Sequence, residues 1–243
     1  MQVVTSDELE AIKRRNPRLI FTIGPPGSGK SVQCSKLFSE LKYTSISTGQ
    51  LIREEILKKT KLGEFLASFT LKAELPPLDA VVSLLVRNII SKQGVNTFII
   101  SGFPRTLEQA LYIEKKLMSI NMIVNLNIGD TELLTRRILE RGAKFQIEED
   151  TKEEIVIKTL EEYSKHYLRI KSFYDQFGVI REINANNTAN VIFRNIKQEL
   201  MPKVYSINGK AYSGKTTHAK KLAEKIDSEY LDFNDYLKSE AVK

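Results

Sequence analysis

A chain of 243 residues with 42% hydrophobic and 28% charged residues has the composition of a folded globular protein and excludes wholesale disorder. Its net charge of +7 raises nucleic-acid binding, but basic and acidic residues alternate, as in Glu161–Lys165, so we expect a mixed solvated surface and no nucleic-acid partner. The single cysteine excludes an internal disulfide, and no apolar run approaches the roughly 20 residues of a membrane span, so we expect a cytoplasmic protein without a membrane segment.

The first predicted element is a helix within residues 1–16, an N-terminal helical extension. Thr5 and Glu8 have the spacing of a capping box, and Pro17 ends the helix. From there, short β-branched runs alternate with segments of helical period. We expect buried strands at Leu19–Ile23, Thr97–Ile100, Met122–Ile128 and Val179–Ile183, and helices at Asp79–Ser91, Thr106–Ser119 and Glu132–Arg141. This order predicts an α/β fold in three layers, with a parallel sheet flanked by helices on both faces.

The segment Gly142–Asp150 is polar and loosely patterned, so we expect a short, mobile lid or loop there. A long amphipathic helix is expected to follow it. Its apolar residues recur near helical spacing, and we expect the aromatic ones in the core: Ile155, Leu160, Tyr163, Tyr167, Ile170 and Phe173.

An internal repeat begins after Pro202, because the segment from Val204 onward matches the segment from Leu19 onward at a constant offset. Gly24 corresponds to Gly209 and Lys30 to Lys215, without a gap through the next helical stripe. We therefore expect a first domain at 17–201 and an incomplete second unit at 202–243. That unit is expected to hold a strand, a phosphate-binding loop, its helix and a following strand, and not to catalyse alone.

The loop between the first strand and the next helix reads Gly24-Pro-Pro-Gly27-Ser-Gly29-Lys30-Ser31, which is the P-loop pattern. Its glycines let backbone N–H groups turn inward around a phosphate. Lys30 is expected to reach the β- and γ-phosphates of ATP, and the Ser31 hydroxyl to meet Mg²⁺. The repeat offers a second loop with the same pattern, containing Gly209, Gly214, Lys215 and Thr216.

Three further motifs follow the P-loop in order. Gly102-Phe-Pro-Arg105-Thr-Leu-Glu-Gln109-Ala110 comes directly after the Thr97–Ile100 strand, Ser47-Thr48-Gly-Gln-Leu-Ile-Arg53 precedes it, and Arg137-Ile-Leu-Glu-Arg141-Gly142 lies in the helix before the expected lid. Together with the P-loop, they resemble the signature motifs of adenylate kinases and related nucleoside monophosphate kinases over residues 18–201.

The resemblance implies reversible phosphoryl transfer from ATP to AMP, with Mg²⁺ bound to ATP. Arginine suits such a site because its guanidinium binds phosphate oxygens in pairs, and phosphoryl transfer depends mainly on positioning and charge. The residues implied for catalysis are Lys30, Arg105 and Arg141; for ATP binding Gly24, Gly27, Gly29, Lys30, Ser31 and Arg137; and for AMP binding Thr48, Arg53, Gly102, Arg105 and Gln109.

The chain departs from the family pattern at two places. Ser101 stands where relatives carry the aspartate that organises the waters around magnesium, and Gln146 or Ile147, together with Thr159, stand where relatives carry two lid arginines. Two hypotheses therefore remain: a working but slow kinase, or a catalytically impaired nucleotide-binding subunit that serves a structural or regulatory role beside other subunits, for example in a ciliary or flagellar assembly.

Overall fold

The computed structural model describes residues 4–72, 74–201, 205–225, 229–233 and 235. The chain divides into two compact units, Met1–Leu200 and Met201–Lys243, which are described separately below. Every strand in the described residues belongs to the first unit, which also holds every predicted site residue except those of the second loop.

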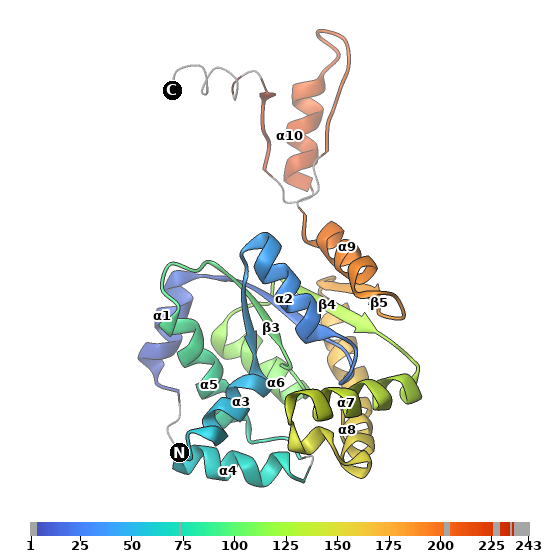
Figure 1. The fold of residues 1–243 in the computed structure, drawn as a ribbon. Coiled ribbons are helices and arrows are strands. Elements are labelled where there is room, and N and C mark those ends of the chain that lie inside the picture. Colours follow the sequence, from blue (N-terminus) through green and yellow to red (C-terminus); the bar gives the residue numbers. More distant parts are fainter. Residues whose placement is uncertain (1–3, 73, 202–204, 226–228, 234, 236–243) are drawn as a thin grey trace. The chain divides into compact units, whose positions relative to one another are not determined.

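The first unit alternates strands and helices along the chain (Figure 1). Its strands are β1 (Arg18–Ile23), β2 (Thr44–Ser47), β3 (Thr97–Ser101), β4 (Met122–Asn127) and β5 (Ile180–Asn184). Its α-helices are α1 (Ser6–Arg15), α2 (Lys30–Leu41), α3 (Thr48–Leu57), α4 (Lys61–Thr70), α5 (Leu78–Ser91), α6 (Leu107–Tyr112), α7 (Thr131–Phe145), α8 (Glu153–Asp175) and α9 (Ala189–Leu200), with one π-helical turn, η1 (Ile113–Leu117), and one 3₁₀ turn, η2 (Glu148–Asp150). The four predicted strands and the predicted helices are confirmed, apart from shifts of a few residues at their ends.

The five strands form one parallel sheet in the order β2-β3-β1-β4-β5. β1 lies at the centre, where Leu19 is opposite Phe98 in β3 and Ile20 is opposite Met122 in β4. Parallel strands need a crossover between them, and helices supply each crossover here. The predicted α/β class is therefore confirmed.

Both faces of the sheet are buried, which explains the nearly continuous apolar runs of the central strands. Leu19, Phe21 and Ile23 pack into one core with α1, α5 and α6, whereas Ile20 packs into the other with α2, α7 and α9. The long helix α8 serves both cores, since its first turns contribute Val156 and Leu160 to one and its later turns Ile170 and Tyr174 to the other. The carboxyl ends of β1, β3 and β4 are left at one edge of the sheet for the site.

The N-terminal helix α1 is capped as expected and packs onto the domain. Thr5 and Glu8 form the reciprocal hydrogen bonds of a capping box. Ile12 is buried in the core shared with α5, and the Arg15 guanidinium donates to the carbonyl of Ile89 at 2.9 Å. The extension is thus fixed to α5 by both apolar and polar contacts.

The segment expected to be a lid is largely helical, so the loop prediction for Gly142–Asp150 is wrong for most of that range. α7 continues to Phe145 and ends where Gln146 adopts a left-handed conformation, and the turn η2 follows at once. No proline lies between Arg141 and Phe145, so every residue there can donate its backbone N–H and the helix extends until its C-cap at Gln146. The connection between α7 and α8 is consequently short.

The second unit contains α10 (Lys215–Lys225), preceded by a tight turn. We expected a strand on either side of this helix. The described residues 205–209 and 229–233 form no strand, so the prediction is wrong for those residues. A strand requires a hydrogen-bonded neighbour, and the described part of this unit offers no second strand to pair with. No residue of α10 is buried within the described part of the chain.

Candidate functional site

The loop between β1 and α2 is shaped by its glycines. Gly24 and Gly27 have φ values of +141° and +80°, a region that side-chain-bearing residues rarely adopt. A Cβ on Gly24 would lie 2.6 Å from the Leu126 carbonyl oxygen, and one on Gly27 would lie 2.9 Å from that of Leu134. The loop therefore fits closely against the end of β4 and the first turns of α7, and Gly29 caps the N-terminus of α2.

Lys30, the first residue of α2, folds back over this loop. Its Nζ donates to the carbonyl oxygens of Gly24 and Pro25 at 2.7 and 2.8 Å, and also to the Ser28 hydroxyl at 3.4 Å. Desolvation, followed by the charges of Arg105 and Arg141, lowers the pKa of Lys30 to about 7. The ammonium thus lies in a field that favours the arrival of a polyanion.

Arg105 follows β3 in the segment Gly102–Arg105. Its Nε donates to the Gly102 carbonyl at 3.0 Å, and its backbone N–H donates to Oε1 of Gln109 at 2.6 Å. Desolvation, followed by the charges of Arg141 and Arg53, lowers the pKa of Arg105. Three guanidinium groups from α3, the β3–α6 segment and α7 are therefore close enough to repel one another.

Arg141 is held by an acidic partner from the turn that follows its own helix. Its Nε and Nη2 both lie 2.6 Å from Oδ2 of Asp150, whose side chain is 9% exposed. Gly142 makes this approach possible, because a Cβ there would lie 2.6 Å from the Asp150 carbonyl oxygen. The position of Arg141 thus depends on the turn η2.

These groups surround one cleft of about 200 Å³ at the carboxyl ends of β1 and β3. Ligands of open α/β sheets bind at this edge of the strands. The predicted site residues that line the cleft are Gly24, Lys30, Ser31, Arg53, Gly102, Arg105 and Arg141. Those predicted for the site but outside its lining are Gly27, Gly29, Thr48, Gln109 and Arg137.

Thr48 and Gln109 lie behind the cleft wall. Thr48 is 3% exposed, and its hydroxyl donates to the carbonyl of Ser101 at 3.2 Å. A Cβ on Gly102 would lie 2.7 Å from that hydroxyl oxygen. Gln109 is 4% exposed and accepts from Arg105, so in this structure both side chains hold the β3–α6 segment in place.

Ser101 and Thr159, two of the residues that depart from the family pattern, lie at the cleft. Ser101 is buried at the end of β3 and lines the cleft, as Lys30 and Arg105 do. Thr159 lines the opposite wall from α8, and its hydroxyl donates to the Ile155 carbonyl at 2.8 Å. Gln146 is exposed at the end of α7 and outside the lining. None of these three side chains brings a charge to the site.

The sequence did not indicate several other residues of the cleft. Thr70, Glu74 and Pro76 form part of one wall, and Glu162 and Tyr163 form part of the opposite wall. The two walls also touch through Lys158, whose Nζ donates to the Lys72 carbonyl at 2.8 Å. The helical spacing of apolar residues around Tyr163 predicted a core position for it. The 70–76 segment has no sequence pattern that points to a binding site.

The second loop repeats several details of the first. The Nζ of Lys215 donates to the Lys210 carbonyl at 2.6 Å, as Lys30 does to the residue five positions before it, and the Ser213 N–H donates to the same carbonyl at 3.3 Å. Gly214 has a φ of +80°, and Tyr212 has a φ of +61° where the first loop has Gly27. The backbone therefore turns alike in both loops, with a bulkier residue in the second.

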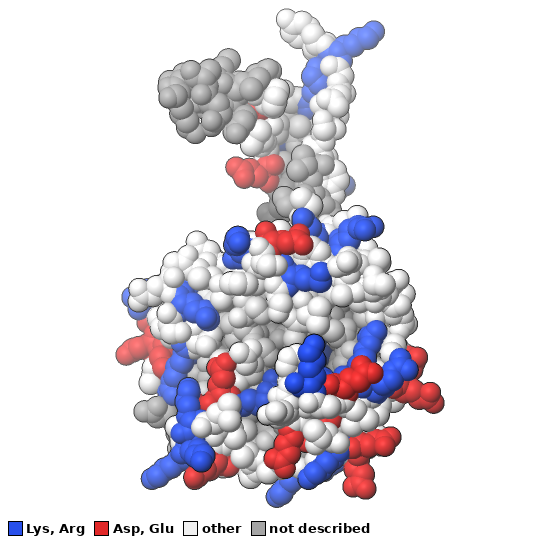
Figure 2. Space-filling model, in the orientation of Figure 1, with Lys and Arg blue, Asp and Glu red and all other residues white. Residues whose placement is uncertain are grey.

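The surface of the first unit carries charged side chains of both signs (Figure 2). Figure 2 shows Lys and Arg side chains interspersed with Asp and Glu on the visible face of the first unit, without a continuous basic block. In the described part of the chain, no helix has both the length and the apolar character needed to cross a membrane. Nor do the described residues contain a group of three His, Cys, Asp or Glu side chains that could hold a metal.

Comparison with known proteins gives a consistent result. The family model described as "Adenylate kinase" matches residues 22–179, which include every residue of the cleft lining. The chain is 35% identical over 185 residues to adenylate kinase isoenzyme 1 of Rattus norvegicus, and 34% identical over 185 residues to that of Gallus gallus. Each of these alignments covers 76% of this chain and 94% of the relative. This chain is also 33% identical to adenylate kinase isoenzyme 1 of Homo sapiens over 187 residues, again with 76% of this chain and 94% of the relative covered.

Proposed function

This chain belongs to the adenylate kinase family, and from that premise we propose that it transfers the γ-phosphoryl group of ATP to AMP, giving two ADP. Membership makes it a phosphotransferase enzyme and supports nucleoside monophosphate kinase activity. In the reaction, an oxygen of the AMP phosphate forms a bond to the γ-phosphorus while the bond from that phosphorus to the β-phosphate oxygen breaks. The leaving group is ADP, and the acceptor also becomes ADP.

The observation that supports this proposal best is the meeting of Lys30, Arg105 and Arg141 in one cleft. All three line the same cleft, and the charges of the two arginines contribute to the lowered pKa of Lys30. Such a set of fixed cations stabilises negative charge spread over the transferring phosphoryl oxygens. We therefore assign catalysis to these three residues.

The acceptor AMP would lie on the side of the cleft formed by α3 and the segment after β3. Arg53 and Arg105 line that side and can bind the AMP phosphate with paired N–H donors. Gly102 brings the backbone close to Thr48, and Gln109 orients Arg105 through its backbone N–H. Thr48 favours AMP over pyrimidine monophosphates by its resemblance to AMP-specific relatives.

The donor ATP would have its phosphates on the P-loop. Gly24, Gly27 and Gly29 shape that loop, and Arg137, one helical turn before Arg141 on α7, would stack on the donor adenine.

Magnesium fits this site as an ion carried by ATP. The Ser31 hydroxyl in the first turn of α2 and the hydroxyl of Ser101 are hard oxygen ligands, but neither carries charge, so the phosphates would provide most of the coordination. When bound, Mg²⁺ withdraws negative charge from the β- and γ-phosphate oxygens. The side chains of this chain would orient the waters around the ion and hold the phosphates in line.

We also propose that transfer is slower than in relatives that carry all the charged groups. Ser101 lacks the negative charge of an aspartate beside the ion, and Thr159 points from the α8 wall without a cation. Lys158, which lies on the same helix, donates to the Lys72 carbonyl and is outside the cleft lining. Loss of one charge-stabilising contact lowers a rate by about a hundredfold or more.

The proposal is tested by a coupled assay of ADP formation from ATP and AMP with Mg²⁺. We expect turnover from the full chain and its loss in Lys30→Ala, with nucleotide binding measured in parallel by calorimetry. Lys13→Ala, on the exposed face of α1, is the control that should keep full turnover. Binding without turnover would reject the kinase and favour the alternative of a nucleotide-binding structural or regulatory subunit.

Three further points stay predictions. The second loop, with Gly209, Gly214, Lys215 and Thr216, is proposed as a phosphate-binding loop without catalysis of its own. If the two units act independently, Lys215→Ala should leave the kinetics of ADP formation unchanged. Location in the cytoplasm or in a cilium or flagellum, and association with other subunits, rest on the sequence alone.

A further inference from the structure

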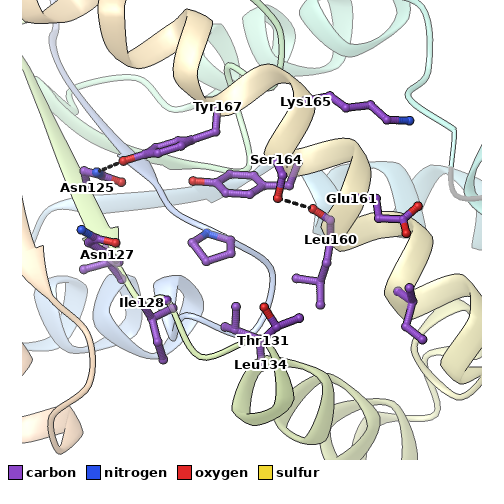
Figure 3. A pocket seen from close by; sticks show the side chains of 15 residues that line it. Asn125, Asn127, Ile128, Thr131, Leu134, Leu160, Glu161, Ser164, Lys165 and Tyr167 are labelled. Atoms are coloured by element: carbon purple, nitrogen blue, oxygen red, sulfur yellow. Dashed lines mark hydrogen bonds between the residues drawn. The ribbon is translucent and has the colours of Figure 1, made fainter.

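A second cavity of about 660 Å³ lies beyond the carboxyl end of β4, between α7 and α8 (Figure 3). Figure 3 shows Asn125 and Asn127 on one side of it, Leu134 below, Leu160 and Ser164 of α8 on the other side, and Tyr167 of α8 above, beside Asn125. The nucleotide cleft and this cavity share one lining residue, Tyr163. Of the P-loop, only Pro25 reaches its lining, and none of the residues predicted to bind phosphate does.

Two residues that line the cavity each carry a buried polar atom that lacks a hydrogen-bond partner. In the described residues these are Oδ1 of Asn125 and the hydroxyl of Tyr163. The amide orientation of Asn125 is determined by its surroundings, because Nδ2 donates to the Glu182 carboxylate at 2.7 Å and to the Tyr167 hydroxyl at 2.6 Å. A carboxylate only accepts, so Oδ1 must face away from it. A buried polar atom without a partner costs free energy, and a ligand can relieve that cost.

Tyr163 offers a hydroxyl that stays protonated. Burial, then the charges of Tyr167 and Glu182, raises the pKa of Tyr163 above its usual range. Its ring stacks on that of Tyr167, with centroids 5.3 Å apart and planes 26° from parallel. The lining therefore combines aromatic surface with one acceptor and one hydroxyl donor, alongside the apolar side chains of Ile128 and Leu134.

The charges at the cavity favour an uncharged occupant. Glu161 and Lys165, both exposed on α8, bring opposite charges to its edge. The Lys165 ammonium already pairs with Glu162 at 2.6 Å. Because the described lining holds no other cation, a phosphate group would find no counter-charge here, unlike in the nucleotide cleft.

We propose that this cavity is a second binding site, for an uncharged planar heteroaromatic molecule with an N–H donor and an acceptor on one edge, as in a purine nucleoside. The donor would meet Oδ1 of Asn125, the acceptor would meet the Tyr163 hydroxyl, and the ring system would lie against the apolar wall. A cavity of this size lies within the range of about 300–1,000 Å³ typical of small-molecule sites.

The test is calorimetric titration of the full chain with adenosine while the cleft is filled. ATP and AMP are present at saturating concentration, and the metal is chelated so that no turnover occurs. We expect binding of one adenosine per chain, and at least tenfold weaker binding of N6,N6-dimethyladenosine, which lacks the exocyclic N–H donors. Absence of binding with the cleft filled, or equal affinity for both nucleosides, would overturn the proposal.

Two matched variants locate the site. Ser164→Phe adds a phenyl ring to an exposed residue that lines the cavity, and we expect at least tenfold weaker adenosine binding. Leu168→Phe adds a ring at an exposed residue one helical turn further along α8, outside the lining, and should bind as the parent does. Methyl NMR signals of Ile128 and Leu134 in the parent chain should shift on adenosine addition, and unchanged signals would contradict the assignment even if a variant failed to fold.

Discussion

The carboxylate of Asp150 lies 2.6 Å from two nitrogens of the Arg141 guanidinium, across the turn that joins α7 to α8. Arg141 is 38% exposed at its side chain, whereas Asp150 is largely buried. The acidic partner therefore fixes the direction of the guanidinium while leaving one side of it available to the cleft. This pair connects the short α7–α8 connection to the phosphate-binding residues.

Replacing the carboxylate by an amide should weaken both stability and catalysis. Asp150→Asn keeps the shape but removes a charge-assisted hydrogen bond, so we expect a loss of about 1.5–3 kcal/mol in the free energy of unfolding. If the displaced Arg141 stabilises the transition state by about 1.4 kcal/mol less, kcat falls roughly tenfold. Urea unfolding and the ADP assay measure the two effects. Glu148→Gln, exposed in the same turn, is the control, and equal behaviour of both variants would contradict the role of the pair.

Nucleotide binding should take up a proton at alkaline pH. The pKa of Lys30 is lowered to about 7, so at pH 8.5 the Lys30 side chain is deprotonated in most molecules of the free protein. The phosphates of ATP favour the charged form, so binding should take up about one proton at that pH and far less at pH 6. Calorimetry in buffers of different ionisation enthalpy measures the uptake, and Lys30→Met should abolish it. A buffer-independent enthalpy for the parent at pH 8.5 would refute the prediction.

The same lowered pKa affects stability with a defined sign. Between pH 7 and the ordinary value of 10.5, the unfolded chain holds the Lys30 proton and the folded chain does not. The contribution of Lys30 to the free energy of unfolding therefore rises with pH across that window.

Introducing a carboxylate beside the proposed magnesium position should accelerate transfer. We expect Ser101→Asp to raise kcat by about 10- to 100-fold and to lower the Mg²⁺ concentration needed for half-maximal rate, because it supplies charge for a hard cation. Ser101→Asn has the same size without the charge and serves as the comparison. If both variants change the rate equally, the effect is steric and the magnesium argument fails.

A cation on the α8 wall should have a similar effect. Thr159 lines the cleft, so Thr159→Arg would bring a guanidinium toward the transferring phosphate, and we expect kcat to rise about tenfold or more. Thr159→Gln gives a long polar side chain without charge and should leave kcat near the parent value. The measurement is the ADP assay at saturating ATP and AMP. A rate for Thr159→Arg no higher than that of Thr159→Gln would argue against a missing lid cation.

Much of the fold could be predicted because the central strands are buried on both faces. β1, β3 and β4 appear in the sequence as short apolar runs, and the glycine-rich loop after β1 has a chemical pattern of its own. β2 was not among the predicted strands, since only Ile46 of Thr44–Ser47 is buried and the other residues are polar. Its extended form comes from pairing with β3, which local sequence does not encode.

The cleft residues that belong to a recognisable sequence motif, such as Lys30 and Arg105, could be predicted. It was not predictable where proximity depends on tertiary packing. Glu74 and Tyr163 both line the cleft, although no sequence pattern links the segments they come from. The strand expected before Gly209 fails for the same reason, since the first loop has the Leu126 carbonyl of β4 packed against it and the second loop has no sheet in the described residues.

Gly142 shows how a residue with no side chain can control reactivity at a distance. The backbone of Asp150 occupies the space where a Cβ at position 142 would lie, so any larger residue must displace the turn that carries the acidic partner of Arg141. In a survey of natural or disease-associated variants, an inactive protein altered at Gly142 should therefore be classed with arginine-loss variants. Its defect would appear in phosphate affinity, even though the altered atom itself never meets a nucleotide.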